Sequence, residues 1–383
     1  MRLCPTAPSP FVGIEMTLQE TSSPDAAPSA ARIDAPAPAR RGAVRFWLFA
    51  VAALIFVMVL VGGATRLTES GLSITQWKPL TGVIPPLSAA DWREEFARYR
   101  EIPQFATLNP GMTLDGFKAI FWWEWAHRLL ARVIGVAFIA PALWFWLSGR
   151  LFGAVGRCVL LATGLLALEP IVGWWMVSSG LSERTEVAQE RLAIHLLIAA
   201  ATFGVLVYAG AGFRARRPSP VSARFAPASI VFAALVFAQL GLGALVAGLR
   251  AGLVYNTWPL MDGRWVPEGA FALSPWPRSI VDDAGTVQFD HRMLAYGIVA
   301  FALAQSLVAA RAAPGTALAR RTLALAGLAL VQAALGVANL LLLVPIGLAL
   351  AHQALAMALF GTAMAHAGAI RAERRVALVA DSD

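Results

Sequence analysis

The sequence predicts an all-α protein that crosses a membrane eight times and consists of two four-helix halves that repeat each other. Of its 383 residues, 58% are hydrophobic and 14% are charged, and the mean hydropathy is +0.64, far from the values of a water-soluble domain. Eight apolar runs are each long enough to cross the hydrocarbon core of a bilayer. Motifs of the first half recur in the same order in the second half.

The elements follow one another with short connections, apart from two long loops. Residues 1–44 are rich in Ala, Pro and Ser, which predicts a disordered tail, and we expect no cleavable signal peptide there. The predicted spans are residues 46–64, 124–147, 155–178, 191–212, 227–248, 290–310, 320–341 and 346–367. Residues 45–213 form the N-terminal half, 214–226 a linker, 227–368 the C-terminal half and 369–383 a second tail.

Charge distribution predicts the orientation. Arginines crowd one set of short loops, whereas the long loops at 65–123 and 249–289 mix both signs of charge. By the positive-inside rule, both termini are cytoplasmic and the long loops face the periplasm of a bacterial inner membrane. The net charge of +8 therefore indicates lipid, and no nucleic acid, as partner. In the first long loop, the spacing of Trp92, Phe96 and Tyr99 predicts a short amphipathic helix on the membrane surface.

The internal repeat is visible in the long loops and in the histidines that follow them. The next histidine comes 68 residues after His127 (195 − 127) and 61 residues after His291 (352 − 291). An even number of spans in each half predicts parallel repeats about an axis along the membrane normal. In order, the corresponding residues are Arg66 and Arg250, Gly71-Leu72 and Gly252-Leu253, Trp77 and Trp258, His127-Arg128 and His291-Arg292.

Four histidines (His127, His195, His291 and His352) lie at one predicted depth, near the outer ends of the even-numbered spans. A single one could be a hydrogen-bonded packing residue, but two symmetry-related pairs favour metal ligation. One pair from two helices in each half fits bis-histidine haem ligation better than a copper or zinc centre, which would bring carboxylates or thiolates. His366 has no counterpart and is predicted to be structural. Cys4 and Cys158 predict neither a disulfide nor a thiolate metal site.

Glu124 precedes His127 by three residues, and its counterpart before His291 is the neutral Gln288. This asymmetry predicts that one pocket holds a redox cofactor and the other a reacting substrate. The alternative is that Glu124 caps its helix or pairs with Arg128 one turn later. The arginines near the outer ends of spans are candidates for haem propionate contacts or for interfacial anchors: Arg66, Arg128, Arg132, Arg250 and Arg292.

Residues 45–367 resemble the haem A synthases, in particular the proteobacterial and mitochondrial branch that lacks a cysteine pair in the outer loops. The resemblance rests on Gly62-Gly63-Ala64-Thr65-Arg66, Trp77-Lys78-Pro79, Glu124-Trp125-Ala126-His127-Arg128, Gly173-Trp174-Trp175-Met176, Asn256-Thr257-Trp258-Pro259 and His352-Gln353. One departure is Leu168-Glu169-Pro170, where a Leu-Gln-Gly type of sequence is expected. A buried Glu169 followed by a helix-kinking Pro170 makes the packing there unusual.

The resemblance implies an oxidoreductase acting on a CH, CH2 or CH3 group, which converts a methyl group of haem O to the formyl group of haem A for terminal oxidases. It implies that His127 and His195 ligate the substrate haem O, with Glu124 as the catalytic carboxylate. It further implies that His291 and His352 hold a haem B (iron protoporphyrin IX) as electron-transfer cofactor. Haem O synthase (protohaem farnesyltransferase) is the expected donor of haem O, and a homo-oligomer is left open.

Two other functions share part of this pattern. A di-haem b-type electron carrier would use the same histidines without needing Glu124, although such carriers usually place their haems on both sides of the bilayer. A parallel-repeat transporter would use histidines as proton relays near the midplane.

Overall fold

The computed structural model describes residues 38–182, 184–213 and 220–380. The predicted tail up to residue 37, linker residues 214–219 and the last three residues, 381–383, lie outside this range. Within this range, every regular element is a helix, and Met261 and Arg264 form one isolated β-bridge.

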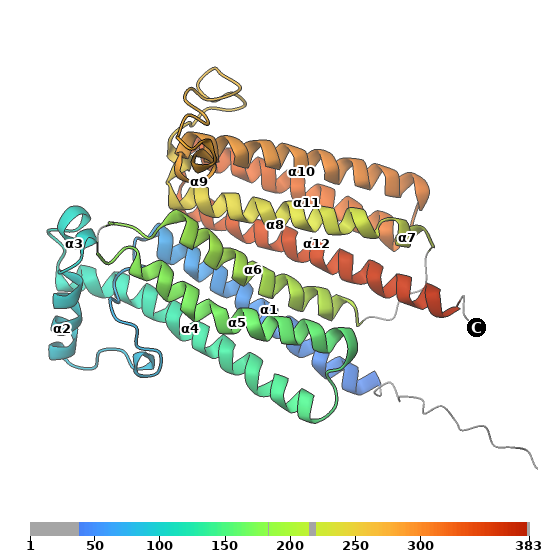
Figure 1. Cartoon of the computed structure of the whole chain (residues 1–383), viewed down its shortest axis with the longest axis horizontal. Coiled ribbons are helices and arrows are strands. Elements are labelled where there is room, and N and C mark those ends of the chain that lie inside the picture. Colours follow the sequence, from blue (N-terminus) through green and yellow to red (C-terminus); the bar gives the residue numbers. More distant parts are fainter. Residues whose placement is uncertain (1–37, 183, 214–219, 381–383) are drawn as a thin grey trace, which may run out of the picture. The chain divides into compact units, whose positions relative to one another are not determined.

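Among the described residues, eight helices are long and apolar enough to cross a membrane, which confirms the prediction of an all-α polytopic membrane protein (Figure 1). They are α1 (Pro38–Leu67), α4 (Leu114–Leu147), α5 (Gly153–Ser178), α6 (Gln189–Ala211), α8 (Ala226–Gly248), α10 (Ala284–Ala312), α11 (Ala317–Leu341) and α12 (Ile346–Ala380). The shorter helices are α2 (Ala89–Tyr99), α3 (Pro103–Leu108), α7 (Pro220–Arg224) and α9 (Ser279–Asp282), with 3-10 turns η1 (Thr81–Val83), η2 (Ala251–Leu253) and η3 (Trp276–Arg278).

The two halves have the same internal arrangement. In the N half (α1, α4, α5 and α6), α4 and α6 each pack against α1 and α5, so α4 and α6 are diagonal to each other. In the C half (α8, α10, α11 and α12), α10 and α12 each pack against α8 and α11. The halves meet where α1 and α6 contact α12 and where α6 contacts α8. The histidine-bearing helices are therefore the diagonal pair of each half.

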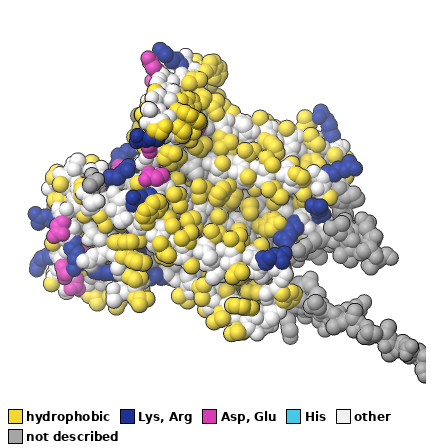
Figure 2. Space-filling model, viewed as in Figure 1, with side chains coloured by type: hydrophobic (Ala, Val, Ile, Leu, Met, Phe, Trp, Pro, Cys, Tyr) yellow, Lys and Arg dark blue, Asp and Glu magenta, His cyan; other side chains and the backbone are white. Residues whose placement is uncertain are grey.

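Both long loops lie at one end of the helices, here called the loop end (residues 68–113 and 249–283), and the start of α1 and the end of α12 lie at the opposite end (Figure 1). The face drawn in Figure 2 is hydrophobic along the helices, with both signs of charge at the loop end and dark blue Lys and Arg groups at the opposite end. Large apolar side chains such as Val136, Trp146 and Leu160 are exposed along the helices. An apolar belt between charged ends is the surface that a bilayer requires.

Helix α4 begins ten residues earlier than predicted, at Leu114 instead of residue 124. The Thr113 hydroxyl accepts a hydrogen bond from the Gly116 N–H and caps the helix. The added turns bury Phe117 and Phe121 in a cluster with Tyr99 of α2. The predicted helix α2 is present, but its apolar face packs on this extension of α4, and Tyr99 is 0% exposed. The expectation that α2 lies on the membrane surface by this face was therefore wrong.

Three helical segments occupy residues that the sequence assigned to tails and linker. Helix α1 already includes residues 38–44, α7 lies in the linker, and α12 continues through residues 369–380. Alanine and arginine, which are strong helix formers, make up more than half of residues 38–44 and of residues 369–380. An ion pair from Arg321 of α11 to Glu373, 2.9 Å long, holds the end of α12 against its neighbour.

Candidate functional site

His291 of α10 and His352 of α12 face each other inside the C half. Their ring centroids are 6.5 Å apart and the ring planes are inclined by 65°. Bonds between a metal ion and an imidazole nitrogen are about 2 Å long, so two rings that share one metal ion have centres roughly 6 Å apart. The observed separation therefore matches two imidazoles placed to bind one iron from opposite sides.

His127 and His195 stand at the corresponding positions of the N half, on its two diagonal helices α4 and α6. In both halves, each ring lies against a glycine of a neighbouring odd-numbered span, and the space left for a side chain at that glycine differs from one position to the next. A Cβ atom would lie 3.3 Å from His127 Nε2 at Gly62, 3.2 Å from His195 Cε1 at Gly173, 3.4 Å from His291 Cε1 at Gly243 and 2.8 Å from His352 Cε1 at Gly336.

A second recurring feature is the residue one helical turn before each of these glycines. Gln239 and Gln332 place their Nε2 atoms 3.1 Å from Nδ1 of His291 and of His352, respectively. Glu169 places Oε2 2.6 Å from Nδ1 of His195. At the fourth position, before Gly62, the residue is Met58. Gln239 and Gln332 were not among the residues predicted from the sequence, and Glu169 was noted there only for its unusual packing. The shared spacing of a Gln or Glu four residues before a Gly was a readable signal.

These residues fit a bis-histidine haem in each half. Each pair comes from two diagonal helices, so a flat macrocycle between the rings would be enclosed by all four helices of that half. Each glycine removes a side chain beside a ring, and the Oε1 atoms of Gln239 and Gln332 are buried with no hydrogen-bond partner among the described residues. An amide behind a ligating imidazole can turn this oxygen to the free N–H of the ring. Among those residues no cluster of three or more His, Cys, Asp or Glu could hold a metal ion.

Glu124 is 2% exposed and its carboxylate is fully engaged. One oxygen accepts from the Ser73 hydroxyl at 2.7 Å and from the Ile74 N–H at 2.8 Å, and the other pairs with Arg128 at 2.6 Å. The pairing with Arg128 that the sequence left as an alternative is thus present. In the C half, Gln288 donates to the Tyr255 carbonyl at 3.1 Å instead. Within the described residues, only the N half therefore carries a buried ion pair one turn from a paired histidine.

Three of the five candidate arginines hold the long loops through backbone carbonyls. Arg128 donates to the carbonyls of Ile74 and Gln76, and Arg292 donates to those of Tyr255 and Thr257, the corresponding positions of the second loop. Arg132 donates to the carbonyls of Lys78 and Pro79. Arg128 and Arg132 also line a half-open cavity of about 240 Å³ beneath the first long loop.

Comparison with known proteins identifies the family. Residues 45–364 match the family described as cytochrome oxidase assembly protein. The haem A synthase of Rhodopseudomonas palustris (strain BisA53) is 54% identical over 317 residues, which cover 82% of this chain and 87% of that protein. Those of Brucella anthropi and Brucella ovis are 50% and 49% identical over 328 residues, 85% of this chain and 91% of each relative. The chain belongs to the haem A synthase family. The resemblance stated from its motifs is confirmed.

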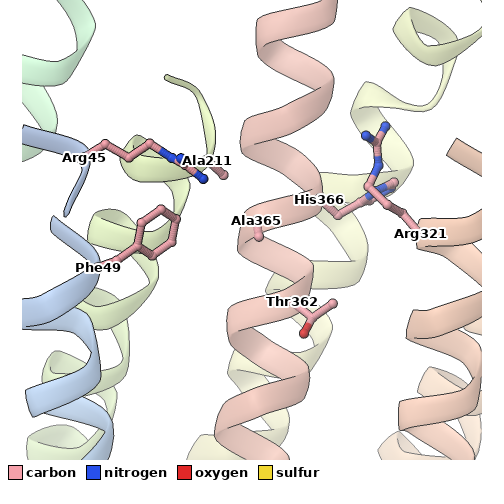
Figure 3. A pocket seen from close by; sticks show the side chains of 7 residues that line it. All are labelled: Arg45, Phe49, Ala211, Arg321, Thr362, Ala365 and His366. Carbon is pink, nitrogen blue, oxygen red and sulfur yellow. The ribbon is translucent and has the colours of Figure 1, made fainter. Parts of the chain in front are cut away.

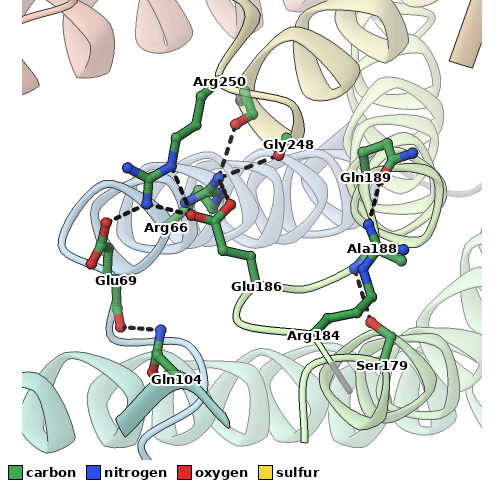
Figure 4. A network of polar contacts seen from close by, with 11 residues as sticks. Arg66, Glu69, Gln104, Ser179, Arg184, Glu186, Ala188, Gln189, Gly248 and Arg250 are labelled. Atoms are coloured by element: carbon green, nitrogen blue, oxygen red, sulfur yellow. Dashed lines mark hydrogen bonds and ion pairs between the residues drawn. The ribbon is translucent and has the colours of Figure 1, made fainter. Parts of the chain in front are cut away.

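The two remaining candidate arginines of this haem A synthase family member join the halves at the loop end (Figure 4). Arg66 of α1 donates to Glu186 at 2.7 Å and to the Ala247 carbonyl at 3.1 Å. Arg250 pairs with the same Glu186 and with Glu69, and these hydrogen bonds, that to Glu186 first, raise the pKa of Arg250. Both guanidinium groups are therefore already bound to protein carboxylates.

This network also corrects the predicted repeat alignment. Glu69 lies two residues before Gly71, and Arg250 lies two residues before Gly252. Both have left-handed backbone, with φ of 56° and 51°. The structural counterpart of Arg250 is therefore Glu69 and not Arg66, and the two counterparts form an ion pair with each other.

His366 lies near the opposite end of the molecule from the four paired histidines of this family member. It is 2% exposed and lines a cavity of about 250 Å³ with Arg45, Phe49 and Arg321 (Figure 3). Its predicted structural role stays a prediction. Cys158 is a free thiol half-buried in α5, and Cys4 lies outside the described residues.

Proposed function

We propose that this chain oxidises a methyl group of haem O to the formyl group of haem A, with the two halves doing different work. The N half would hold haem O on His127 and His195, and the C half would hold haem B on His291 and His352. The observation that carries the proposal is the facing imidazole pair of the C half, 6.5 Å between ring centroids. His127 and His195 hold the same places on the diagonal helices of the N half, each beside a glycine. Relatives with about 50% identity are named haem A synthases, which supports the reaction.

Glu124 is proposed as the catalytic carboxylate of the N half. It lies on the same helix face as His127, one turn earlier. Arg128, the Ser73 hydroxyl and the Ile74 N–H hold its charge at a fixed position in a buried setting. A preorganised charge in a site of low dielectric constant acts strongly on any charge that develops near it. The neutral Gln288 would leave the C half without this charge. Haem B, when bound there, would supply one-electron transfer.

The distribution of charged side chains supports a proposed location and orientation of the protein in the membrane. Lys and Arg gather at the end opposite the long loops, which supports an inner-membrane protein with cytoplasmic termini and haem sites toward the periplasm. The haem O substrate would come from haem O synthase. The propionates of a bound haem would meet the loop end, where Arg128 and Arg132 line a cavity.

Extraction of haem from the purified protein tests the function. We expect haem B together with haem O, a hydroxylated intermediate or haem A, because only a synthase needs the last three. Haem B alone would favour the di-haem electron carrier, and absence of any visible chromophore would favour the transporter.

The Glu124→Ala variant tests the proposed carboxylate. We expect it to keep the haem B spectrum while haem A formation falls by at least about a hundredfold, the scale of a lost catalytic acid or base. The haem B signal in the same sample controls for folding. A normal yield of haem A from this variant would exclude a catalytic role for Glu124.

His291→Ala and His352→Ala should remove the low-spin signal of the cofactor.

A further inference from the structure

We propose that Glu169 is a positioning residue that fixes His195 for haem and makes it a stronger electron donor than the histidines of the C half. This inference rests on the proposed function, because it takes His195 as a haem ligand. Glu169, which with Pro170 departs from the expected family sequence, would then have a function of its own.

The contact is direct and buried. Oε2 of Glu169 on α5 lies 2.6 Å from Nδ1 of His195 on α6, and both side chains are largely shielded from solvent. One turn later on α5, Gly173 lies against the Cε1 edge of the same ring. Within the described part of the chain, both oxygens of Glu169 and Nδ1 of His195 are buried and make no aligned hydrogen bond, so the 2.6 Å contact is an ion-pair distance. The imidazole is thus held on one side by glycine and at one nitrogen by a carboxylate.

A carboxylate and an amide do different things at this position. Ionised Glu only accepts hydrogen bonds, so it requires a proton on Nδ1 and leaves the lone pair of Nε2 for the iron. Gln can present either its oxygen or its NH2 group, so it does not select the tautomer. A carboxylate behind a ligating imidazole also raises the basicity of the ligand.

The C half supplies the internal comparison. Gln332 stands four residues before Gly336, as Glu169 stands four before Gly173, and its Nε2 lies 3.1 Å from Nδ1 and 3.3 Å from Nε2 of His352. The Nε2 of Gln239 lies 3.1 Å from Nδ1 and 3.2 Å from Nε2 of His291. Among the described residues, only the N half has a carboxyl group in contact with one of the paired histidines. Added electron density stabilises ferric over ferrous iron, so the N-half haem should have the lower reduction potential of the two.

Reciprocal substitutions test the proposal in the full-length, haem-loaded protein. In Glu169→Gln, the preference of the N-half site for ferric over ferrous haem should fall by about tenfold. This is the low end of the range of effects for mutating a residue that contacts a metal ligand. That change raises the midpoint potential by about 59 mV for one electron. The C-half haem in the same sample should keep its potential. In Gln332→Glu, the C-half potential should fall by a similar amount while the N half keeps its own. The low-spin electron paramagnetic resonance signal of the altered haem should shift in each variant.

The outcomes separate this inference from the proposed function. If the wild-type N half binds haem and both variants leave potentials and spectra unchanged, Glu169 is not a positioning residue, and the proposed function stands. If the N half of the wild type binds no haem, the proposed function fails first. Should Glu169→Gln not assemble, Gln332→Glu decides alone, and an unchanged C-half potential then overturns the inference.

Discussion

The four glycines beside the histidine rings determine how closely the helices approach the site. Gly336 is the tightest, because a Cβ atom there would lie 2.8 Å from Cε1 of His352, closer than folded proteins allow. Gly243 is its counterpart, and a Cβ atom there would be 3.4 Å from His291, an ordinary contact. The same substitution therefore has different consequences at two related positions.

We predict that Gly336→Ala weakens haem binding in the C half by about tenfold to a hundredfold, since overpacking typically costs about 1–3 kcal/mol and each tenfold is about 1.4 kcal/mol. Haem titration followed at the low-spin absorption band measures this. Gly243→Ala is the matched control and should change the affinity less than threefold. Equal losses in both variants would mean that the glycines do not act through contact with the rings.

At the residue scale, the sequence predicted the ligand candidates but not their neighbours. His127, His195, His291 and His352 stood out because imidazoles are scarce in this chain and recur at related positions. The polar partners Gln239, Gln332 and Glu169 act across helices, so their role depends on which helices are adjacent. The candidate propionate arginines were placed correctly at the loop end, but a sequence cannot show that backbone carbonyls and Glu186 occupy them.

Helix α4 shows how an element compensates for a residue that interrupts it. Pro141 lies inside the helix and has no N–H, so the carbonyl of Ala137 loses its usual donor. The indole N–H of Trp47 on α1 donates to that carbonyl at 3.0 Å. The Trp47 ring also stacks on Phe138, with centroids 5.3 Å apart. The Trp47 side chain therefore supplies the hydrogen bond that Pro141 removes, and it links α1 to α4.

A double-mutant cycle tests this compensation. Trp47→Phe keeps a ring but removes the donor, so it should lower the free energy of unfolding by about 1 kcal/mol. In a Pro141→Ala background, the substituted residue supplies a helical N–H again, and the same change should cost less than half as much. Thermal unfolding of the four proteins in detergent gives the coupling. Equal costs in both backgrounds would show that the hydrogen bond does not compensate for the proline.

At the element scale, apolar run length located all eight spans, and the errors occur at their ends. The start of α4 carries Asp115 and Lys118, which lower its hydropathy, so the predicted span began too late. These turns are stabilised by packing on α2 outside the apolar run, and hydropathy does not report such packing. The ends of α1 and α12 were missed because a polar composition allows either a tail or a helix.

The two halves contact each other through reciprocal pairs. Phe203 of α6 lies against Gly361 of α12, and Phe360 of α12 lies against Gly204 of α6. Phe203 and Phe360 are 157 residues apart, as are Gly204 and Gly361, and the same separation holds for His195 and His352 (352 − 195). Such reciprocal packing is expected of a parallel repeat, which stays a prediction. The sequence predicted two halves, but it could not predict that α6 and α12 form the contact between them. Hydropathy identifies apolar helices and does not tell which of them are neighbours.

The ion pairs at the loop end join the same two halves where the helices leave the apolar belt. Arg250 comes from the C half, whereas Glu69 and Glu186 come from the N half, and Arg66 shares Glu186 (Figure 4). These side chains are partly exposed, so each pair should contribute no more than about 1 kcal/mol, and salt should screen it.

We predict that Arg250→Glu lowers the thermal midpoint of unfolding in low salt, because it places a third carboxylate beside Glu69 and Glu186. Adding Glu69→Arg should recover most of the loss, since it restores opposite charges across the boundary between the halves. At about 1 M salt, where charges are screened beyond about 3 Å, the three proteins should unfold within a narrower range. A loss that persists in high salt, or that Glu69→Arg does not reduce, would mean that Arg250 acts through the left-handed turn it occupies and not through its charge.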